Sequence, residues 1–388
     1  MHLTKEEERI YDGEFGWANQ TCMRILVRLG ELFGAAKLIP ISSAHVSGVS
    51  YKTLGDAPSD FLETLASSGT KTKVKTTLNP QSFDASYLRK KLPHELFEKQ
   101  SNVMKYFQKM GFEPSLTCTP YYLERPKKNS HLAWAESSAV VYANSIEEAW
   151  TNREGGPSAL AAAVIGKTPN YGIHQIENRQ PSAVVKLEKP LLKDLEFGAL
   201  GILLGKILGE QIPAIRGLGN ASADDLKQLG AALASSGMVN MLCFKPVKSD
   251  VAEKITVEAK DIKRTIETLT TAQIAKPDLV FLGCPHCSLN ELRQIASLIG
   301  NRKVRNGMEF WVCTSCYVKN KAKKYVEKIE NCGGHVLTDT CAVVTWTDKL
   351  GIKSVMTNSA KTAHYAPTLN KAETVFASSA DCLNTALQ

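Results

Sequence analysis

The sequence predicts an α/β protein of several lobes with mostly parallel sheets. Short apolar segments that end in glycine, cysteine or small polar residues alternate with longer segments whose apolar residues recur at helical spacing. The clearest example lies in Lys276–Val343, where the apolar Asp278–Leu282 runs into Gly283-Cys284-Pro285 and the amphipathic Leu289–Ile299 follows. With 388 residues, of which 43% are hydrophobic, the chain is long enough to bury the cores of two or three such lobes.

The composition and charge of the chain exclude several classes of protein and several kinds of partner. Met1–Arg9 is charged and begins a helix at Thr4, so it is not a secretion signal, and no apolar run approaches the roughly 20 residues of a membrane span. We therefore expect a soluble cytoplasmic protein without a membrane partner. The formal charge is +8, but the lysines are dispersed without interleaved aromatic residues, so we expect no nucleic-acid partner. Ten cysteines in a reducing compartment indicate metal binding, redox chemistry or plain burial, and not a disulfide framework.

Residues 1–175 form the first expected lobe. Its expected helices are Phe15–Phe33, Ser59–Ser68 and Leu96–Met110, and its expected strands are Lys37–Ile41, Lys73–Thr77 and Pro114–Thr117. The three strands end in turn at a loop of small hydroxylated residues and glycine (Ser42–Ser50), at Asn79-Pro80 and at Cys118. Such a loop can turn backbone N–H groups and hydroxyl groups toward an anion. Polar residues and a thiol thus follow successive strands.

Residues 176–272 form a second expected lobe of the α/β type. Its expected elements are, in chain order, strand Ala183–Leu187, helix Glu196–Leu208, strand Pro213–Ile215, helix Asp224–Ser235, strand Val239–Phe244 and the helix-prone Glu258–Ala272. Gly198, Gly201 and Gly205 have the spacing of close helix packing and do not form a dinucleotide-binding fingerprint. We assign no site residue to this lobe.

Residues 273–388 form the third expected lobe, in which cysteine follows three strands. The expected strands and the motifs after them are Asp278–Leu282 with Cys284, Met308–Val312 with Cys313-Thr314-Ser315-Cys316, His335–Leu337 with Asp339-Thr340-Cys341, and Lys353–Met356 with Thr357–His364. The carboxyl ends of parallel strands meet at one edge of a sheet. Several of these thiols are therefore expected to converge on one site.

The spacing of the cysteines is compatible with two alternative kinds of metal site. Cys284-x-x-Cys287 and Cys313-x-x-Cys316 resemble a zinc ribbon, since four thiolates suit tetrahedral zinc, but the gap between the pairs exceeds the usual ~15–20 residues. Three thiolates and one open position are what a catalytic iron–sulfur centre needs. That alternative takes one thiolate from each of three strand ends: Cys118, Cys284 and Cys341.

Four motifs, in their order along the chain, resemble the aconitase X family. They are Ser43–Ser50, Thr117-Cys118-Thr119-Pro120-Tyr121, Gly283-Cys284-Pro285-His286 and Asp339-Thr340-Cys341. The resemblance spans almost the whole chain, whose length is similar to that of the separate large subunit of the archaeal type. It implies aconitase-like α/β/α lobes that lack the small swivelling domain, which bacterial members usually carry in the same polypeptide.

The resemblance implies a hydro-lyase of isoprenoid biosynthesis by a modified mevalonate pathway. The implied reaction is the dehydration of (R)-5-phosphomevalonate to trans-anhydromevalonate 5-phosphate, with an iron–sulfur cluster of the 4Fe-4S type as Lewis acid. No catalytic base is assigned in this chain, because aconitase-like enzymes take it from a serine of the small domain. The implied partner is therefore a small swivelling-domain subunit, in a heterodimer or a higher assembly. Two alternatives remain open, a dehydratase of cis-3-hydroxy-L-proline or another hydroxy acid, and a zinc-dependent binding protein.

The resemblance also implies roles for particular residues. Cys118, Cys284 and Cys341 hold the cluster. Contacts with the substrate are implied for Gly48, Val49, Ser50, Asn79, Pro80, Glu136, Ser137 and Lys361, of which Lys361 faces the carboxylate or phosphate of the anionic substrate. His45 and His286 are candidates for orienting or proton-relay roles, against the commoner role of histidine as a structural hydrogen-bonding group.

Overall fold

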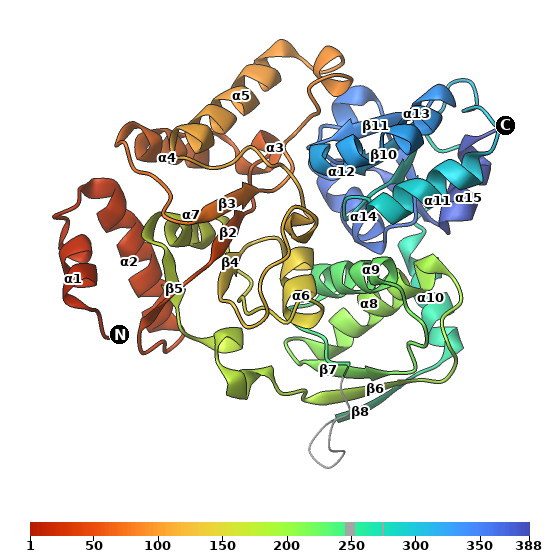
Figure 1. Ribbon diagram of the computed structural model, residues 1–388. Coiled ribbons are helices and arrows are strands. Elements are labelled where there is room, and N and C mark those ends of the chain that lie inside the picture. Colours follow the sequence, from red (N-terminus) through yellow and green to blue (C-terminus); the bar gives the residue numbers. More distant parts are fainter. Residues whose placement is uncertain (245–252, 274) are drawn as a thin grey trace. The chain divides into compact units, whose positions relative to one another are not determined.

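The computed structural model forms two compact units (Figure 1). It describes residues 1–244, 253–273 and 275–388, so residues 245–252 of the predicted lobe 176–272 and residue 274 of the predicted lobe 273–388 lie outside the described residues. The first unit comprises Met1–Gln81 and Pro93–Gln180, and the second comprises Ser82–Leu92 and Pro181–Gln388. In the described part of the chain, the larger sheets are parallel throughout, which confirms the predicted fold class.

A parallel sheet organises the first unit. Its central strand β2 (Ser43–Val46) lies between β3 (Lys75–Leu78) and β4 (Leu132–Trp134). Single parallel bridges at Leu116 and Arg153 extend the sheet beyond β3 and β4. Five segments of the chain therefore run in the same direction, and their carboxyl ends lie at one edge.

The strand predicted within Lys37–Ile41 forms, whereas the prediction of a loop over Ser42–Ser50 is wrong for Ser43–Val46. β1 (Leu38–Pro40) pairs antiparallel with β5 (Lys167–Pro169) in a separate two-stranded sheet, and the first part of the predicted loop, Ser43–Val46, is the central strand β2. A central strand of a parallel sheet is buried on both faces, so its sequence shows no alternation of apolar and polar residues. The run from Ala44 to Val46 is buried throughout, which is why its small and polar residues do not resemble a strand.

The predicted strand Pro114–Thr117 is also wrong in extent, because only the bridge at Leu116 forms. Proline lacks the N–H that a continuous ladder requires, which is consistent with this short pairing.

The helices of the first unit agree with the sequence where their apolar stripe is clear. They include α1 (Lys5–Asp12), α2 (Trp17–Leu32), α3 (Tyr51–Leu54), α4 (Asp56–Ser67), α5 (His94–Lys109), α6 (Ser137–Ser145) and α7 (Gly156–Ile165). α1 begins at Thr4 as predicted, and the side chains of Thr4 and Glu7 form a capping box. Nearly all residues of α6 and α7 are buried, so helical periodicity does not reveal these two helices. None of the helices among the described residues is long and apolar enough to cross a bilayer.

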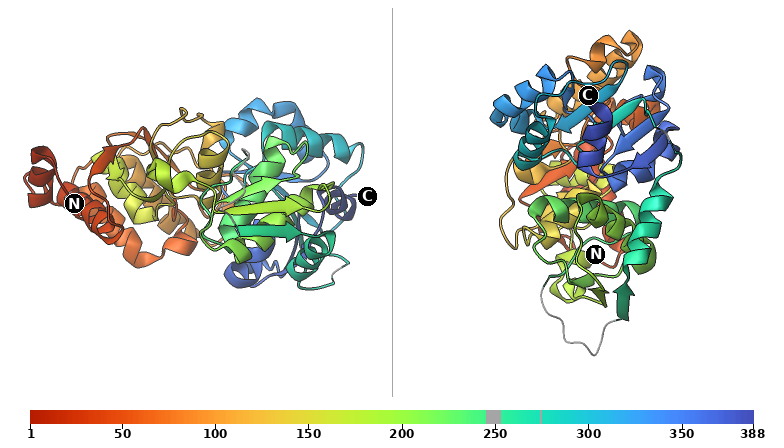
Figure 2. Two further views of the ribbon diagram at one scale, coloured as in Figure 1. Left: turned by 90° about the horizontal axis from the view of Figure 1, so that it is seen from below. Right: turned by 90° about the vertical axis from the view of Figure 1, so that its right-hand side faces the viewer.

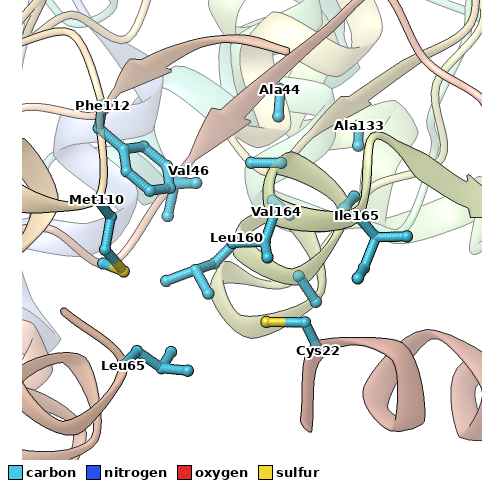
Figure 3. Close-up of a cluster of buried hydrophobic side chains, with 14 of the residues drawn as sticks. Cys22, Ala44, Val46, Leu65, Met110, Phe112, Ala133, Leu160, Val164 and Ile165 are labelled. Atoms are coloured by element: carbon cyan, nitrogen blue, oxygen red, sulfur yellow. The ribbon is translucent and has the colours of Figure 1, made fainter. Parts of the chain in front are cut away.

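Helix α7 lies at the centre of the hydrophobic core of the first unit. Its residues Leu160, Val164 and Ile165 project among side chains of neighbouring elements, including Val46 of β2 and Cys22 of α2 (Figure 3). Burial raises the pKa of the Cys22 thiol to about 12. Cys22 therefore packs as a small apolar residue.

A three-stranded parallel sheet with two closely packed helices follows in the second unit. Its elements are β6 (Ala183–Leu187), α8 (Asp194–Leu208), β7 (Pro213–Arg216), α9 (Ala223–Ser236), β8 (Glu253–Val257) and α10 (Ala259–Leu269), with the strand order β7-β6-β8. A Cβ atom on Gly201 of α8 would lie 2.5 Å from the carbonyl oxygen of Leu229 on α9, which confirms the predicted packing role of the glycines. The predicted strand Val239–Phe244 is wrong apart from a bridge at Cys243, because single hydrogen bonds replace a ladder there.

The remainder of the second unit, the cyan to blue part of the chain in Figures 1 and 2, contains a five-stranded parallel sheet. Its strand order is β11-β10-β9-β12-β13. Its strands are β9 (Leu279–Leu282), β10 (Glu309–Thr314), β11 (His335–Thr338), β12 (Ser354–Thr357) and β13 (Glu373–Phe376), and its helices are α11 (Leu289–Ile299), α12 (Cys316–Lys321), α13 (Lys323–Asn331), α14 (Ala360–Tyr365) and α15 (Ser379–Ala386). β10 and β11 continue on one side of β9, and β12 and β13 on the other. Ligands of open α/β sheets bind at such a reversal of strand order, outside the carboxyl ends.

A short arm, Ser82–Leu92, belongs by its contacts to the second unit. The buried Asp84 carboxylate accepts hydrogen bonds from the backbone N–H groups of Tyr87 and Leu88 at 2.9 and 2.7 Å. The Tyr87 ring stacks on His335, and its hydroxyl donates to Glu309 at 2.7 Å. The arm is therefore capped by its own aspartate and held by the first residues of β10 and β11.

Two histidines form a pair inside the first unit. The Nδ1 atoms of His131 and His174 lie 2.9 Å apart, so one ring donates and the other accepts, and the accepting ring is neutral. His174 is buried, and burial, assisted by His131 and Arg179, lowers its pKa to about 3.

We therefore expect acid to destabilise the first unit through His174. The unfolded chain takes up this proton near pH 6.5 and the folded chain only near pH 3, so the free energy of unfolding should decline as the pH falls below 6.5. The expected slope is about 1.4 kcal/mol per pH unit. Urea unfolding of the wild type and of His174→Gln, from about pH 7 to 4, should give a shallower slope for the variant. Equal slopes would contradict the assignment.

Candidate functional site

One edge of the first-unit sheet gathers most of the predicted substrate residues. Val46 at the end of β2 lies opposite Leu78 at the end of β3, Leu78 lies opposite Leu116, and β4 lies on the other side of β2. The segments that follow at this edge are Ser47–Ser50, Asn79-Pro80, Thr117-Cys118 and Ala135-Glu136-Ser137. The structure thus brings Gly48, Val49, Ser50, Asn79, Pro80, Cys118, Glu136 and Ser137 to the edge of one sheet. Cys284, Cys341 and Lys361 belong to the second unit.

A chain of hydrogen bonds that converges on Glu136 connects the strand ends of the first unit. The Thr77 hydroxyl donates to Nδ1 of His45 at 2.7 Å, and Nε2–H of His45 donates to Oδ1 of Asn79 at 3.2 Å. The Asn79 amide N–H donates to Glu136 at 2.8 Å, and Glu136 accepts from the Ser138 hydroxyl at 2.8 Å. Glu136 also caps α6 through the Ser138 N–H. The result is a fixed orientation of the Asn79 amide.

His45 is buried completely within this chain. Burial lowers its pKa to about 4, so the imidazole is neutral at neutral pH. Because both ring nitrogens have hydrogen-bond partners, the geometry supports an orienting role of His45 toward Asn79 more directly than a proton-relay role. Glu136 is also buried, which excludes simple solvation of its carboxylate at the surface.

The loop after β2 is held by a buried glutamine that sequence reasoning missed. Nε2 of Gln100 donates to the carbonyl of Val49 at 3.0 Å, and its Oε1 accepts from the backbone N–H of Tyr51 at 2.8 Å. Gln100 occupies the buried face of α5 together with Val103 and Phe107. A polar residue at a position where helical spacing calls for an apolar one is the signal that could have revealed it.

Cys118 is buried between two threonines that stabilise its backbone. The Oγ1 atoms of Thr117 and Thr119 lie 3.0 Å apart, and the Thr119 N–H donates to Thr117 Oγ1 at 3.0 Å. The Thr117 N–H in turn donates to the carbonyl of Leu78 at 2.9 Å. The position of the thiol is therefore fixed relative to the end of β3.

In the second unit, the loop that carries Cys284 leaves β9 through a glycine that no other residue can replace. Gly283 has a φ of +107°, and a Cβ atom there would lie 2.3 Å from the carbonyl oxygen of Cys313. The same carbonyl accepts from the Cys287 N–H at 2.9 Å, and the Thr314 hydroxyl donates to the carbonyl of Cys287 at 2.7 Å. Both hydrogen bonds involve the backbone of Cys287, so the end of the turn is fastened to β10.

His286 connects this loop with the loop that carries Cys341. Its ring is fully buried, and Nε2 lies 3.0 Å from the carbonyl oxygen of Thr340, which can only accept. Nε2 therefore carries a proton and donates it to this bond. One imidazole thus ties the residue before Cys341 to the turn that follows Cys284.

The thiols of Cys284 and Cys341 are buried and lie near each other. Burial, together with the nearby Cys284, raises the pKa of Cys341 to about 12, although the Lys361 ammonium acts in the opposite direction. Lys361 follows β12, and Cys284 follows β9. These are the two strands at which the strand order reverses, so the structure places two thiols and a cation at the expected ligand crevice of this sheet.

The remaining cysteines of the two C-x-x-C pairs, Cys287, Cys313 and Cys316, lie in different environments. Cys313 lies inside β10 and not beyond its end, which corrects the prediction that it follows a strand. Burial and the neighbouring thiols raise its pKa well above the usual range. Cys287 is buried, whereas Cys316 is exposed at the start of α12. Among the described residues, no group of three or more histidine, cysteine, aspartate or glutamate side chains is placed to hold a metal ion.

Comparison with known families matches three consecutive stretches of the chain. The models of the first, second and third domains of aconitase X match residues 1–177, 181–267 and 277–388.

Curated relatives are similar over nearly the whole chain. The phosphomevalonate dehydratase large subunit of Methanocaldococcus jannaschii is 46% identical over 97% of this chain and 98% of its own length. The same-named protein of Thermococcus kodakarensis is 42% identical over 94% and 95%. The cis-3-hydroxy-L-proline dehydratase of Pseudomonas aeruginosa is 33% identical over 98% of this chain and 69% of its own length.

A solved structure shares the fold. The crystal structure of Thermococcus kodakaraensis aconitase X in its holo-form covers all of both chains with a TM-score of 0.93 and 39% sequence identity. Family models, full-length relatives and fold agree with the motifs at the strand ends, and the chain therefore belongs to the aconitase X family.

Proposed function

We propose that the chain is the large subunit of a hydro-lyase that converts (R)-5-phosphomevalonate to trans-anhydromevalonate 5-phosphate. The main support is that five archaeal relatives, 37–46% identical over at least 94% of this chain, bear the name phosphomevalonate dehydratase large subunit. Relatives named cis-3-hydroxy-L-proline dehydratase are 33% identical. Dehydration of cis-3-hydroxy-L-proline is therefore the second candidate.

We propose Cys118, Cys284 and Cys341 as ligands of an iron–sulfur cluster. Cys284 and Cys341 are buried neighbours, as ligands of one centre must be. Burial raises the pKa of Cys341, and the positive charge of a bound metal centre and of the nearby Lys361 would favour the thiolate. Cys118 stands at the corresponding strand end of the first unit. When bound, the cluster supplies a Lewis acid for the departing hydroxyl group.

The proposed work of the chain's own residues is binding and orientation. Lys361 offers a positive charge to the anionic substrate, and the Asn79 amide, fixed by His45 and Glu136, offers oriented polar contacts. Gly48, Val49, Ser50, Pro80 and Ser137 complete the proposed substrate contacts. No residue here is proposed as the general base, which the resemblance places on a small subunit.

We propose a small subunit as partner and a cytoplasmic location. The words "large subunit" in the names of the relatives support a partner. None of the ten cysteines forms a disulfide bond, which suits a reducing compartment. We also propose a division into domains of residues 1–175, 176–272 and 273–388, which the ranges matched by the three family models support.

Replacement of a proposed ligand should remove the cluster. Cys284→Ser should lower iron and sulfide per chain and reduce dehydration at least about 100-fold, because serine is a poor ligand for such a centre. The control is Cys332→Ser, which alters another buried thiol of the second unit, at the end of α13. Iron and sulfide analysis of anaerobically purified proteins measures the effect. Normal iron content and turnover in Cys284→Ser would disprove the ligand assignment.

Replacement of the proposed cation should weaken productive substrate binding. A hydrogen bond to a charged group contributes about 1.5–3 kcal/mol, so Lys361→Ala should lower kcat/KM about 10- to 100-fold. Lys353→Ala, at an exposed lysine before β12, serves as the control. An unchanged kcat/KM for Lys361→Ala would show that this lysine faces water only.

The isolated chain should lack dehydratase activity until a small subunit is added. The reconstituted complex should prefer (R)-5-phosphomevalonate to cis-3-hydroxy-L-proline, measured as the ratio of kcat/KM values. Full activity of the isolated chain would contradict the proposed partner, and the opposite substrate preference would favour the second candidate.

A further inference from the structure

The second unit contains a buried lysine, Lys227, to which the proposed function assigns no role. Lys227 lies on α9 and is only 2% exposed. Its ammonium group donates to the backbone carbonyl of His286 at 3.2 Å, forms an ion pair with Glu291, and lies 3.8 Å from Asp224. Removing a charge from water costs several kcal/mol unless protein groups replace the lost hydration. Two of the groups that do so here belong to the segment that carries Cys284 and the start of α11.

Glu291 couples the lysine to the beginning of α11. The Glu291 carboxylate accepts the Ser288 N–H at 2.7 Å, and the Ser288 hydroxyl accepts the Glu291 N–H at 3.0 Å, which forms a capping box. The helix therefore starts at a defined residue directly after Cys287. Lys227 binds the carboxylate that fixes this start.

His286 extends the same connection to the second thiol. Lys227 holds the backbone of His286, two residues after Cys284, and the His286 ring donates to the carbonyl of Thr340, one residue before Cys341. Both cysteine loops are thus linked to α9 through one buried ammonium group.

We propose that Lys227 is a positioning residue that sets the relative placement of Cys284 and Cys341 for a shared metal centre. The identity of that centre as an iron–sulfur cluster rests on the proposed function. Lys227 acts through the backbone of His286 and the side chain of Glu291. The competing role is general stabilisation of the fold, which any buried ion pair can have.

The test removes both charges of the pair. Lys227→Met alone would leave buried carboxylates without their cation and could prevent folding. The main variant is therefore Lys227→Met/Glu291→Gln, in which glutamine keeps an oxygen for the Ser288 N–H. A second variant, Lys227→Gln/Glu291→Gln, keeps a neutral donor and acceptor in place of the ion pair and provides the test should the main variant not fold.

The first unit offers a matched control. Lys167 pairs with Glu7 at 2.7 Å, and Glu7 is the capping-box residue of α1, as Glu291 is of α11. The double variant Lys167→Met/Glu7→Gln removes a pair of the same kind that fixes a helix start distant in sequence from the cysteine motifs.

Two readouts separate positioning from general stability. In anaerobically purified protein, the main variant should bind iron at least about tenfold more weakly than the wild type, which is typical of altered support around a metal site. In metal-free protein, Cys284 should react faster with iodoacetamide, as measured by mass spectrometry of its peptide. The Gln/Gln variant should show smaller changes of the same kind, and the control should match the wild type in both readouts.

Two outcomes would overturn the proposal. One is a folded variant with wild-type iron affinity and a wild-type alkylation rate of Cys284. The other is an equal change in the control, which would indicate general destabilisation. A wild-type protein that binds no iron would refute the proposed cluster, yet the alkylation rates in metal-free protein would still decide the role of Lys227.

Discussion

Parallel pairing is the constraint on which the candidate site depends. Strands that run in the same direction all end at the same edge, so residues far apart in sequence meet there without any direct bond between them. In the first unit this brings the loop after β2 together with Asn79, Cys118 and Glu136. In the second unit it brings Cys284 and Lys361 to the reversal of strand order at β9 and β12. The placement of the proposed site residues at both edges is thus a consequence of the sheet topology.

Burial sets a second condition, because polar groups taken out of water need partners. His45 and His286 meet this condition in similar ways. Each is fully buried, and each bonds to a segment that follows another strand of its own sheet. Their imidazoles connect segments and orient them. Gln100 does the same for the loop after β2 with an uncharged amide. The precise placement of the proposed ligands and substrate contacts therefore comes from side chains that are themselves inaccessible.

The sequence predicts elements well where one face is buried and the other exposed. The bounds of α11 are as predicted, and the capping box of α1 follows from Thr4 and its acidic neighbours. The prediction fails for β2 and α7, which are mostly buried and rich in small residues, so that neither periodicity nor a run of large apolar residues marks them. The strand-end motifs could be found from sequence, whereas Gln100 and Lys227 could not be assigned, since only tertiary contacts show what a polar residue on an apolar face binds.

The arm Ser82–Leu92 lies within the sequence of the first unit but belongs to the second unit, so neither unit is one continuous segment of the chain. A fragment that begins at Pro181 would contain every strand of the second unit but would leave Glu309 and His335 without Tyr87. A fragment that ends at Gln180 would carry the arm without the strands that it covers. A single cut in the gene therefore cannot separate the two units. An exchange of the second unit between family members would have to include the arm.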